Sequence, residues 1–216
     1  MFSFRLYEWR TILNGRIEYK QVNYNNLREM ETIERSKVCG VERAGALDVS
    51  LRKVFQNPRK IVAPYLQEGM TAFDLGCGPG FFTIEMANIV GPTGKVVAVD
   101  LQDGMLEIVK KKIENTSLQN IIELHKCLSD KIGLSTAADF ILIFYMLHEV
   151  PDQVAFLKEV HGLLKPNGKA LIVEPKFHVT KDDFKKYREA LKQIGFGIVE
   201  EPNVFFSRSL LINKIA

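Results

Sequence analysis

The sequence predicts an α/β protein built around a mainly parallel β-sheet. Short apolar runs rich in Val, Ile and Phe alternate with segments of helical length between residues 70 and 194. The runs are continuously apolar, which is typical of strands that helices cover on both faces. With 216 residues, of which 46% are hydrophobic and 25% charged, the chain is long enough to bury such a sheet.

The strands are predicted from five apolar runs and a distinct C-terminal pattern. The five runs cover residues 70–75, 95–101, 121–127, 138–145 and 169–175. After residue 195, two more strand-like runs follow each other through Pro202 and Asn203 without a helix between them. Consecutive strands without a crossover are antiparallel, so we expect the sheet to end in an antiparallel strand.

Four helices are predicted between these strands, over residues 81–90, 104–115, 153–164 and 181–194. Asp103 and Asp152 are expected to cap the second and third of them. Thr180 and Asp183 have the spacing of a capping box, and Gly195 is a natural stop for the last helix. Helices in these positions supply the crossovers that parallel strands need.

The residues before the first strand divide into two parts. Residues 1–45 have no clean periodicity and form an N-terminal extension of uncertain structure, while residues 46–68 are predicted as a helical lead-in. Asn57 and Pro58 fit the N-cap and first position of a helix. The main domain is then expected to cover residues 69–216.

Charge and cysteine content argue against several classes of function. The formal net charge of +3 is too small to indicate a nucleic-acid-binding protein, so no nucleic acid partner is expected. Cys39, Cys77 and Cys127 are scattered and lack Cys-x-x-Cys spacing. They are therefore predicted to be reduced thiols rather than disulfides or zinc ligands.

Membrane and targeting signals are weak. The longest strongly apolar run, residues 140–147, is far shorter than the ~20 residues of a transmembrane helix. Charged residues at positions 5, 8 and 10 interrupt the N-terminus before a signal-peptide core can form. We therefore expect a cytoplasmic protein without a transmembrane segment. The basic and apolar residues from Arg52 to Lys60 leave a contact with a membrane surface open, and a homodimer is also left open.

The most informative stretch is Asp-Leu-Gly-Cys-Gly-Pro-Gly, residues 74–80, between the first strand and the first helix. In an open α/β sheet, ligands bind outside the carboxyl ends of the strands, where helix N-termini and free amides converge. Gly76, Gly78 and Gly80 would let the backbone approach such a ligand closely. Asp100 ends the next strand and is well placed to accept hydrogen bonds from two ribose hydroxyls.

Two other ligand classes fit this loop less well. A dinucleotide fold of the Gly-x-Gly-x-x-Gly type needs its third glycine at position 81, which is Phe81. A phosphate-binding loop needs Gly-Lys-Ser/Thr, which does not follow. Dinucleotide oxidoreduction is therefore the less favoured alternative.

Together, "DLGCGPG" and "VVAVDLQDGML" resemble the class I S-adenosylmethionine-dependent methyltransferases, in particular their small-molecule, quinone-methylase-like branch. The segments "FYMLHEVPD" and "LLKPNGKALIVEP" resemble the fourth strand, the following helix and the fifth strand of that branch. The resemblance covers residues 58–216. It implies a doubly wound, seven-stranded Rossmann-like sheet in the order 3-2-1-4-5-7-6 with an antiparallel last strand. It also implies S-adenosylmethionine as the cofactor and a small or medium-sized molecule as the methyl acceptor.

The resemblance implies a set of cofactor-binding residues at the strand ends. They are Asp74, Gly76, Cys77, Gly78, Gly80, Asp100, Leu101, Met105, Leu128, Ser129 and Phe144. The glycine loop would pass under the methionine part of the cofactor, with Asp74 orienting the loop or reaching the amino group through water. Asp100 would bind both ribose hydroxyls, and Phe144 would close the methionine side.

The adenine would be bound by residues after the second and third strands. Leu101 and Met105 would pack on the ring, and Leu128 with Ser129 would face its amino group. The segment KCLSDKIG, residues 126–133, departs from the Asp-Ala-Glu type of sequence that is commoner at this position in the family. Asp130 is a further candidate for the contact with the adenine amino group.

Three polar residues near the fourth and fifth strands are candidates for catalysis. His148 is either a base, since an ordinary imidazole pKa of ~6.5 suits proton transfer near neutrality, or a residue that orders its loop and contacts the substrate. Glu174 and His178 flank the end of the fifth strand and are expected near His148. Three roles stay open for the group: a catalytic base with its hydrogen-bond partner, a metal site, or simply a polar rim around the acceptor pocket. Methyl transfer by in-line displacement mainly requires alignment, so no metal is expected.

The function predicted from the sequence is therefore methyl transfer from S-adenosylmethionine to a small acceptor. Two alternatives stay open beside dinucleotide oxidoreduction. In the first alternative, the acceptor is a macromolecule such as tRNA or a protein. In the second, the domain binds the cofactor without catalysis.

Overall fold

The computed structural model describes residues 10–13, 16–19 and 56–215. Contacts divide the chain into two units, residues 1–40 and 41–216. In the first unit, β1 (Arg10–Leu13) and β2 (Arg16–Tyr19) form an antiparallel pair. The sequence analysis did not predict these strands. The rest of the predicted extension over residues 1–45 and the basic stretch Arg52–Phe55 lie outside the described residues.

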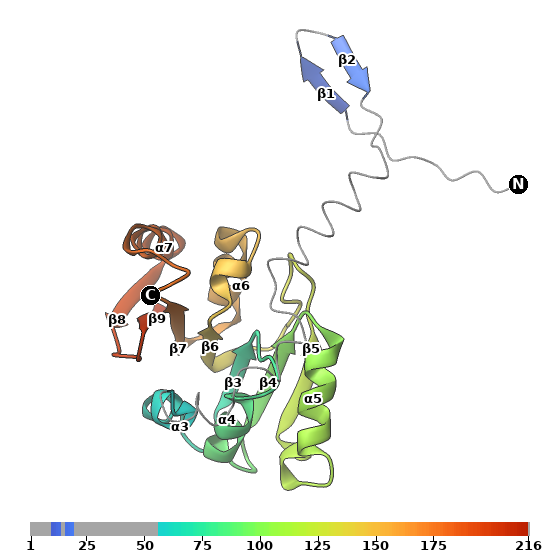
Figure 1. Cartoon of the computed structure of the whole chain (residues 1–216), viewed down its shortest axis with the longest axis vertical. Coiled ribbons are helices and arrows are strands. Elements are labelled where there is room, and N and C mark those ends of the chain that lie inside the picture. The colour runs from blue at the N-terminus through green and yellow to red at the C-terminus, as the bar shows by residue number, and fades with distance from the viewer. Residues whose placement is uncertain (1–9, 14–15, 20–55, 216) are drawn as a thin grey trace, which may run out of the picture. The chain divides into compact units, whose positions relative to one another are not determined.

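The second unit contains a seven-stranded sheet in the order β5-β4-β3-β6-β7-β9-β8 (Figure 1). Its strands are β3 (Thr71–Leu75), β4 (Lys95–Asp100), β5 (Ile122–Lys126), β6 (Ala138–Phe144), β7 (Leu164–Pro175), β8 (Phe196–Glu200) and β9 (Ser207–Lys214). Strands β3 to β7 are parallel, and β9 is antiparallel to both β7 and β8. The predicted order 3-2-1-4-5-7-6 and the antiparallel last strand are confirmed.

Helices cover both faces of this sheet, with α4 and α5 on one side and α6 and α7 on the other (Figure 1). The helices are α3 (Pro58–Val62), α4 (Thr83–Val90), α5 (Asp103–Ile113), α6 (Gln153–Leu163) and α7 (Lys181–Ile194). Short 3-10 turns are η2 (Ala63–Tyr65), η3 (Ser117–Asn120) and η4 (Leu147–Glu149). The doubly wound α/β prediction is therefore confirmed.

Most of the predicted helix signals act as expected. Asn57 caps α3, and Asp152 caps α6 by accepting the amide of Ala155 at 2.9 Å. The capping box of Thr180 and Asp183 is present at the start of α7. Gly195 ends that helix with a left-handed φ of 107°, which glycine adopts at little steric cost.

Three differences from the predicted elements have a clear physical reason. Helix α4 begins at Thr83 rather than residue 81, because the turn that leaves the glycine loop continues through Phe82. Asp103 is the first residue of α5, not its cap; its carboxylate instead pairs with Lys126. Strand β7 begins at Leu164, directly after α6, rather than at residue 169, because its pairing with β6 continues across a bulge between the Ala138–Leu164 and Phe140–Lys169 pairs.

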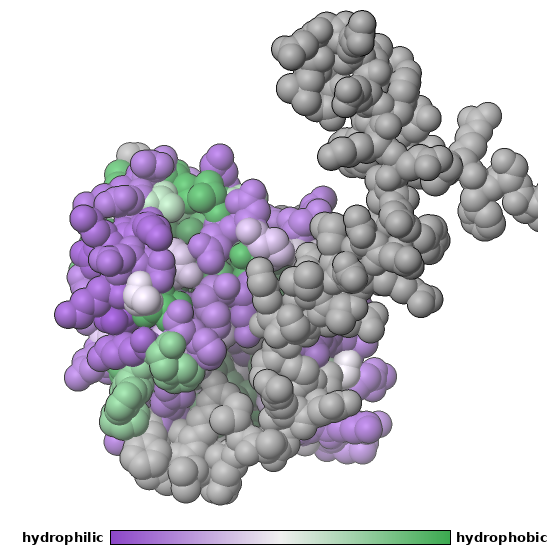
Figure 2. Space-filling view, turned by 45° about the horizontal axis from the view of Figure 1, so that its top comes forward, coloured by the Kyte–Doolittle hydropathy of each residue, from purple (hydrophilic) through white to green (hydrophobic). Residues whose placement is uncertain are grey.

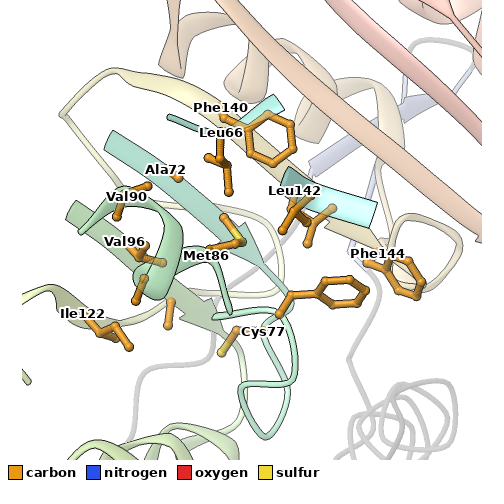
Figure 3. Packing of buried hydrophobic residues seen from close by; sticks show 14 of the residues in the cluster. Leu66, Ala72, Cys77, Met86, Val90, Val96, Ile122, Phe140, Leu142 and Phe144 are labelled. Carbon is orange, nitrogen blue, oxygen red and sulfur yellow. The ribbon is translucent and has the colours of Figure 1, made fainter. Parts of the chain in front are cut away.

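The core alternates strictly between the two faces of the central strands. Phe140, Leu142 and Phe144 of β6 point toward α4 and α5, and the intervening Ile141 and Ile143 point toward α6 and α7. Figure 3 shows the first of these layers, with side chains from β3, β6 and α4 directed toward one another. Each buried large side chain stabilises the fold by roughly 1.5–3 kcal/mol. If a strand shifted its pairing by one residue, its side chains would exchange the two faces of the sheet. The alternation therefore fixes the register of the strands, and with it the residues that lie at the carboxyl edge of the sheet.

The surface of the second unit is mostly polar. Hydrophilic residues cover most of the described surface that Figure 2 shows, and hydrophobic residues occupy smaller areas. Among the described residues, no helix has the length and apolar character that crossing a bilayer requires.

Candidate cofactor and acceptor site

The glycine loop leaves β3 through three residues in left-handed conformations. Gly76, Gly78 and Gly80 have φ values of 70°, 52° and 81°. The amides of Gly76 and Cys77 both donate to the carbonyl of Val99 at 2.9 Å, which ties the loop to the end of β4. A side chain at a left-handed position costs roughly 1–2 kcal/mol, so the backbone path itself explains the three glycines.

The three glycines differ in what surrounds them. A Cβ on Gly76 would lie 2.9 Å from Cγ of Met146, and a Cβ on Gly80 would lie 3.0 Å from Cγ2 of Val109. A Cβ on Gly78 would meet nothing within 4 Å. Gly76 and Gly80 are therefore needed for close packing, whereas Gly78 borders open space that a ligand can approach.

Asp100 joins the glycine loop to the start of α5. Its carboxylate is buried, with Oδ2 accepting the amide of Gly78 and Oδ1 accepting the amide of Gln102, each at 2.8 Å. Burial raises the pKa of Asp100, although the amides of Gln102, Gly78 and Leu101 act in the opposite direction. A carboxylate accepts up to about four hydrogen bonds, so both oxygens retain capacity for ligand hydroxyls.

Asp74 is buried beneath this loop. Its Oδ2 accepts a 2.6 Å hydrogen bond from the hydroxyl of Thr83, the first residue of α4. The bond joins the end of β3 to the start of α4 across the glycine loop. This geometry suits the loop-orienting role that was one of the two expected for Asp74.

Cys77 and Phe144 lie in the hydrophobic layer shown in Figure 3. Burial, followed by the charges of Asp74 and Asp100, raises the pKa of the Cys77 thiol, so the thiol is a poor nucleophile. The ring of Phe144 packs on Phe82 with centroids 4.3 Å apart. Contacts of either residue with the cofactor stay a prediction.

The residues expected around the adenine lie along the same edge of the sheet. Met105 is buried on α5, whereas Leu101 is partly exposed and Leu128 is 63% exposed. The amide of Cys127 donates to the carbonyl of Asp100 at 3.1 Å, which holds the start of the Leu128–Ser129 segment near Asp100. An apolar side chain so exposed at this edge is consistent with a ligand-lining position, which stays a prediction.

His148 and Glu174 meet at the ends of neighbouring strands β6 and β7. Glu174 is fully buried; its Oε1 accepts the amide of Leu147 at 3.0 Å, and its Oε2 lies 2.5 Å from Nδ1 of His148. The exposed ring of His178 stacks on that of His148 with centroids 5.2 Å apart. The expected convergence of these three residues is confirmed, while their roles stay predictions. No cluster of three or more metal-ligating side chains occurs in the described part of the chain.

The pair with Glu174 sets both the tautomer and the basicity of His148. Because Nδ1 donates to the carboxylate, Nε2 of the neutral ring carries the free lone pair. Burial lowers the pKa of His148, but the hydrogen bond and charge of Glu174 and the charge of Glu149 outweigh it, so the pKa is raised. The arrangement provides a base whose protonated form is stabilised.

The turn after β6 contains residues that the sequence analysis missed. Tyr145 adopts a left-handed φ of 59°, and the next side chain, Met146, packs against Gly76. The Tyr145 hydroxyl contacts Gln56 and Ser207, residues 89 and 62 positions away in the sequence. No local sequence signal distinguishes a tyrosine in this conformation.

A family model described as "Methyltransferase domain" matches residues 66–204, which include both the glycine loop and the His148–Glu174 pair. The chain belongs to the methyltransferase domain family. It is 34% identical over 122 residues to the demethylmenaquinone methyltransferase of Lactococcus lactis, covering 55% of this chain and 48% of that protein. It is 38% identical over 126 residues to the demethylmenaquinone methyltransferase of Lactobacillus johnsonii, covering 57% and 49%. The chain thus spans about half the length of the curated relatives it matches.

A solved methyltransferase structure supports the same family at the level of the fold. The crystal structure of an S-adenosylmethionine-dependent methyltransferase from Aquifex aeolicus superposes with a TM-score of 0.74 at 25% identity, covering 82% of this chain and all of that one. These matches agree with the class I S-adenosylmethionine-dependent methyltransferase family that the sequence resemblance predicted.

The residues of this methyltransferase fit S-adenosylmethionine, the cofactor of the family. Gly78 borders open space beside the carboxylate of Asp100, and this carboxylate has acceptor capacity for ribose hydroxyls. Gly78 allows the main chain to run close to a ligand without a side chain between them.

Proposed function

We propose that the chain transfers a methyl group from S-adenosylmethionine to a small or medium-sized acceptor by in-line displacement. One observation carries the proposal: Met146 packs against Gly76 of the cofactor loop, while Leu147 and His148 contact Glu174. The cofactor-type loop and the pair of half-buried His148 with buried Glu174 are therefore held by consecutive residues. When bound, S-adenosylmethionine supplies an electrophilic methyl group on a sulfonium.

The chain's own residues would bind the cofactor, orient the acceptor and remove the acceptor's proton. Asp100 would hold the sugar side of the cofactor, because its carboxylate is already fixed by Gly78 and Gln102. His148 would take a proton from an acceptor hydroxyl at Nε2, and Glu174 would stabilise the resulting imidazolium. Alignment of two bound reactants accounts for up to ~7–11 kcal/mol of barrier lowering in well-oriented systems.

A hydroquinone-type acceptor fits this arrangement best. Its hydroxyl would supply the proton for His148, and loss of that proton would make the aromatic ring electron-rich. A ring carbon would then bond to the methyl group as the sulfur–methyl bond breaks, and the hydrogen on that carbon would leave as a proton to restore the aromatic ring. The relatives are named for demethylmenaquinone, whose reduced form belongs to this chemical class. The exposed ring of His178, stacked beside His148, offers a flat surface for such an acceptor.

Two measurements in sequence test the proposal. Calorimetry with S-adenosylmethionine and with NAD first establishes the cofactor; we expect binding of the former only. The protein is then incubated with methyl-labelled S-adenosylmethionine and a short-chain 1,4-naphthoquinol kept reduced, and mass spectrometry detects label on the acceptor ring. Cofactor binding without label transfer, either to this acceptor or to any component of a cell extract, would support the non-catalytic alternative instead.

A further inference from the structure

We infer that Tyr145 is a positioning residue, whose left-handed backbone and hydrogen-bonded hydroxyl fix the turn that holds His148 against Glu174. The catalytic part of this inference rests on the proposed function, whereas the positioning itself does not. Tyr145 follows β6 directly and precedes the three residues that contact the cofactor loop and Glu174.

The backbone of Tyr145 is strained and anchored. Its φ of 59° is uncommon for a residue with a bulky side chain. The amide of Tyr145 still donates to the carbonyl of Val173 at 2.8 Å, so the residue continues the pairing of β6 with β7 into the turn. Strained conformations persist only where surrounding contacts hold them, and they are concentrated at functional sites.

The hydroxyl of Tyr145 is held from two other segments. The side-chain amide of Gln56 donates to it at 2.5 Å, and Oγ of Ser207 lies 2.6 Å away. Because the Ser207 hydroxyl donates to the carbonyl of Phe205 at 3.0 Å, its oxygen accepts from Tyr145. The chain of hydrogen bonds therefore runs from Gln56, two residues before α3, through Tyr145 after β6 to Ser207 at the start of β9 and on to Phe205.

The three residues that follow Tyr145 all contact the candidate site. Met146 is directed against Gly76, where a single added carbon would lie 2.9 Å from its Cγ. Leu147 and His148 then bind the two oxygens of the buried Glu174. If Tyr145 relaxed to an ordinary φ, the chain direction after β6 would change and these contacts would separate.

Tyr145 acts through His148 and not on the substrate. Its O–H proton is donated to Ser207, so the hydroxyl is a poor general acid or base. The ionisable groups beside His148 are instead Glu174 from β7, Glu149 from η4 and the stacked ring of His178. A substitution of Tyr145 therefore changes the pKa of His148 only if it moves the imidazole relative to these groups.

The test compares Tyr145→Phe with the wild-type protein. The variant retains the ring but loses both hydroxyl contacts. We follow the pKa of His148 by NMR titration of its imidazole, assigned with His148→Asn, and measure cofactor affinity by calorimetry and methyl transfer by steady-state kinetics. The expected results are a His148 pKa shifted down toward its ordinary value of about 6.5, a kcat lowered about tenfold, and a cofactor Kd changed less than about twofold.

Tyr65→Phe is the matched control, because the Tyr65 hydroxyl also makes a 2.7 Å hydrogen bond, to Glu200, without contacting His148. It should leave the His148 pKa unchanged. Ser207→Ala removes one partner of the Tyr145 hydroxyl and should reproduce part of the effect, which keeps the test decisive if Tyr145→Phe folds poorly. An unchanged His148 pKa in both Tyr145→Phe and Ser207→Ala overturns the inference. A shifted pKa in a protein that transfers no methyl group supports the positioning role and counts against the proposed function alone.

Discussion

His148 and Glu174 are 26 residues apart in the sequence, and a 2.5 Å contact between imidazole Nδ1 and carboxylate Oε2 joins them at the ends of adjacent parallel strands. Glu174 is fully buried, and its second oxygen is held by the amide of Leu147. The carboxylate is therefore fixed in place, and the imidazole is oriented with Nε2 available to an acceptor.

The first prediction concerns the pH dependence of turnover. If His148 is the base, kcat should rise with pH through the raised pKa of His148 and then level off, because only the neutral ring accepts a proton. His148→Asn should lower kcat about 10²–10⁴-fold and remove this rise. Steady-state rates between pH 5.5 and 9 measure both effects. His178→Asn, which changes the exposed stacked ring, should keep the pH profile; equal rates for wild type and His148→Asn at every pH would exclude His148 as the base.

The second prediction concerns the pH dependence of stability. The pKa of His148 in the folded protein lies above its unfolded value of about 6.5. The pair with Glu174 therefore stabilises the fold fully below about pH 6.5, and this contribution is lost as the pH rises through the folded pKa. The free energy of unfolding of wild type minus that of His148→Asn, measured in urea, should decrease from pH 6 to pH 9. A difference that grows over this range would mean that the sign of the pKa shift is wrong.

The third prediction separates cofactor binding from folding at two carboxylates. Asp100→Ala should weaken S-adenosylmethionine binding by about 1–3 kcal/mol, or about 5- to 150-fold in Kd, because it removes both the loop anchor and the ribose acceptor. Asp139 is a matched control, since it also accepts a backbone amide, that of Thr71 at 2.8 Å, but at the start of β3. Asp139→Ala should reduce stability and leave Kd unchanged. Equal losses of affinity in the two variants would indicate a general effect on folding.

The fourth prediction distinguishes two glycines of the loop. Gly78→Ala should fold with a cost of about 1–2 kcal/mol for its left-handed φ, but its methyl group would enter the open space and weaken cofactor binding. Gly76→Ala should be more destabilising, because its Cβ also collides with Met146. Thermal unfolding and calorimetry measure the two effects. Wild-type affinity in a folded Gly78→Ala protein would show that the cofactor does not approach the loop there.

Local patterns were sufficient for much of the fold. The continuous apolar runs identified the parallel strands, and the capping box of Thr180 and Asp183 with Gly195 marked both ends of α7. The start of α4 was placed two residues early because Phe81 and Phe82 are apolar, although their backbone still belongs to the turn after Gly80. Asp103 was expected to be a cap, but Gln102 has the extended backbone of the N-cap position. The strands β1 and β2 carried no usable periodicity.

The candidate site was predictable where a residue type has one strong physical reason. Positive φ explains the glycines, and a strand-end carboxylate explains Asp100. The hydrogen bonds of Tyr145 were not predictable, because they depend on contacts with Gln56 and Ser207 over long sequence separations. The same holds for Met146, whose fit against Gly76 follows from the conformation of Tyr145.

The most direct test is a crystal structure with S-adenosylhomocysteine bound, the demethylated form of the cofactor. We predict that both ribose hydroxyls lie within hydrogen-bonding distance of the Asp100 carboxylate and that the amino acid end lies over Gly76 and Gly78. Density for the ligand at any other place, or none at this loop under saturating ligand, would contradict the account.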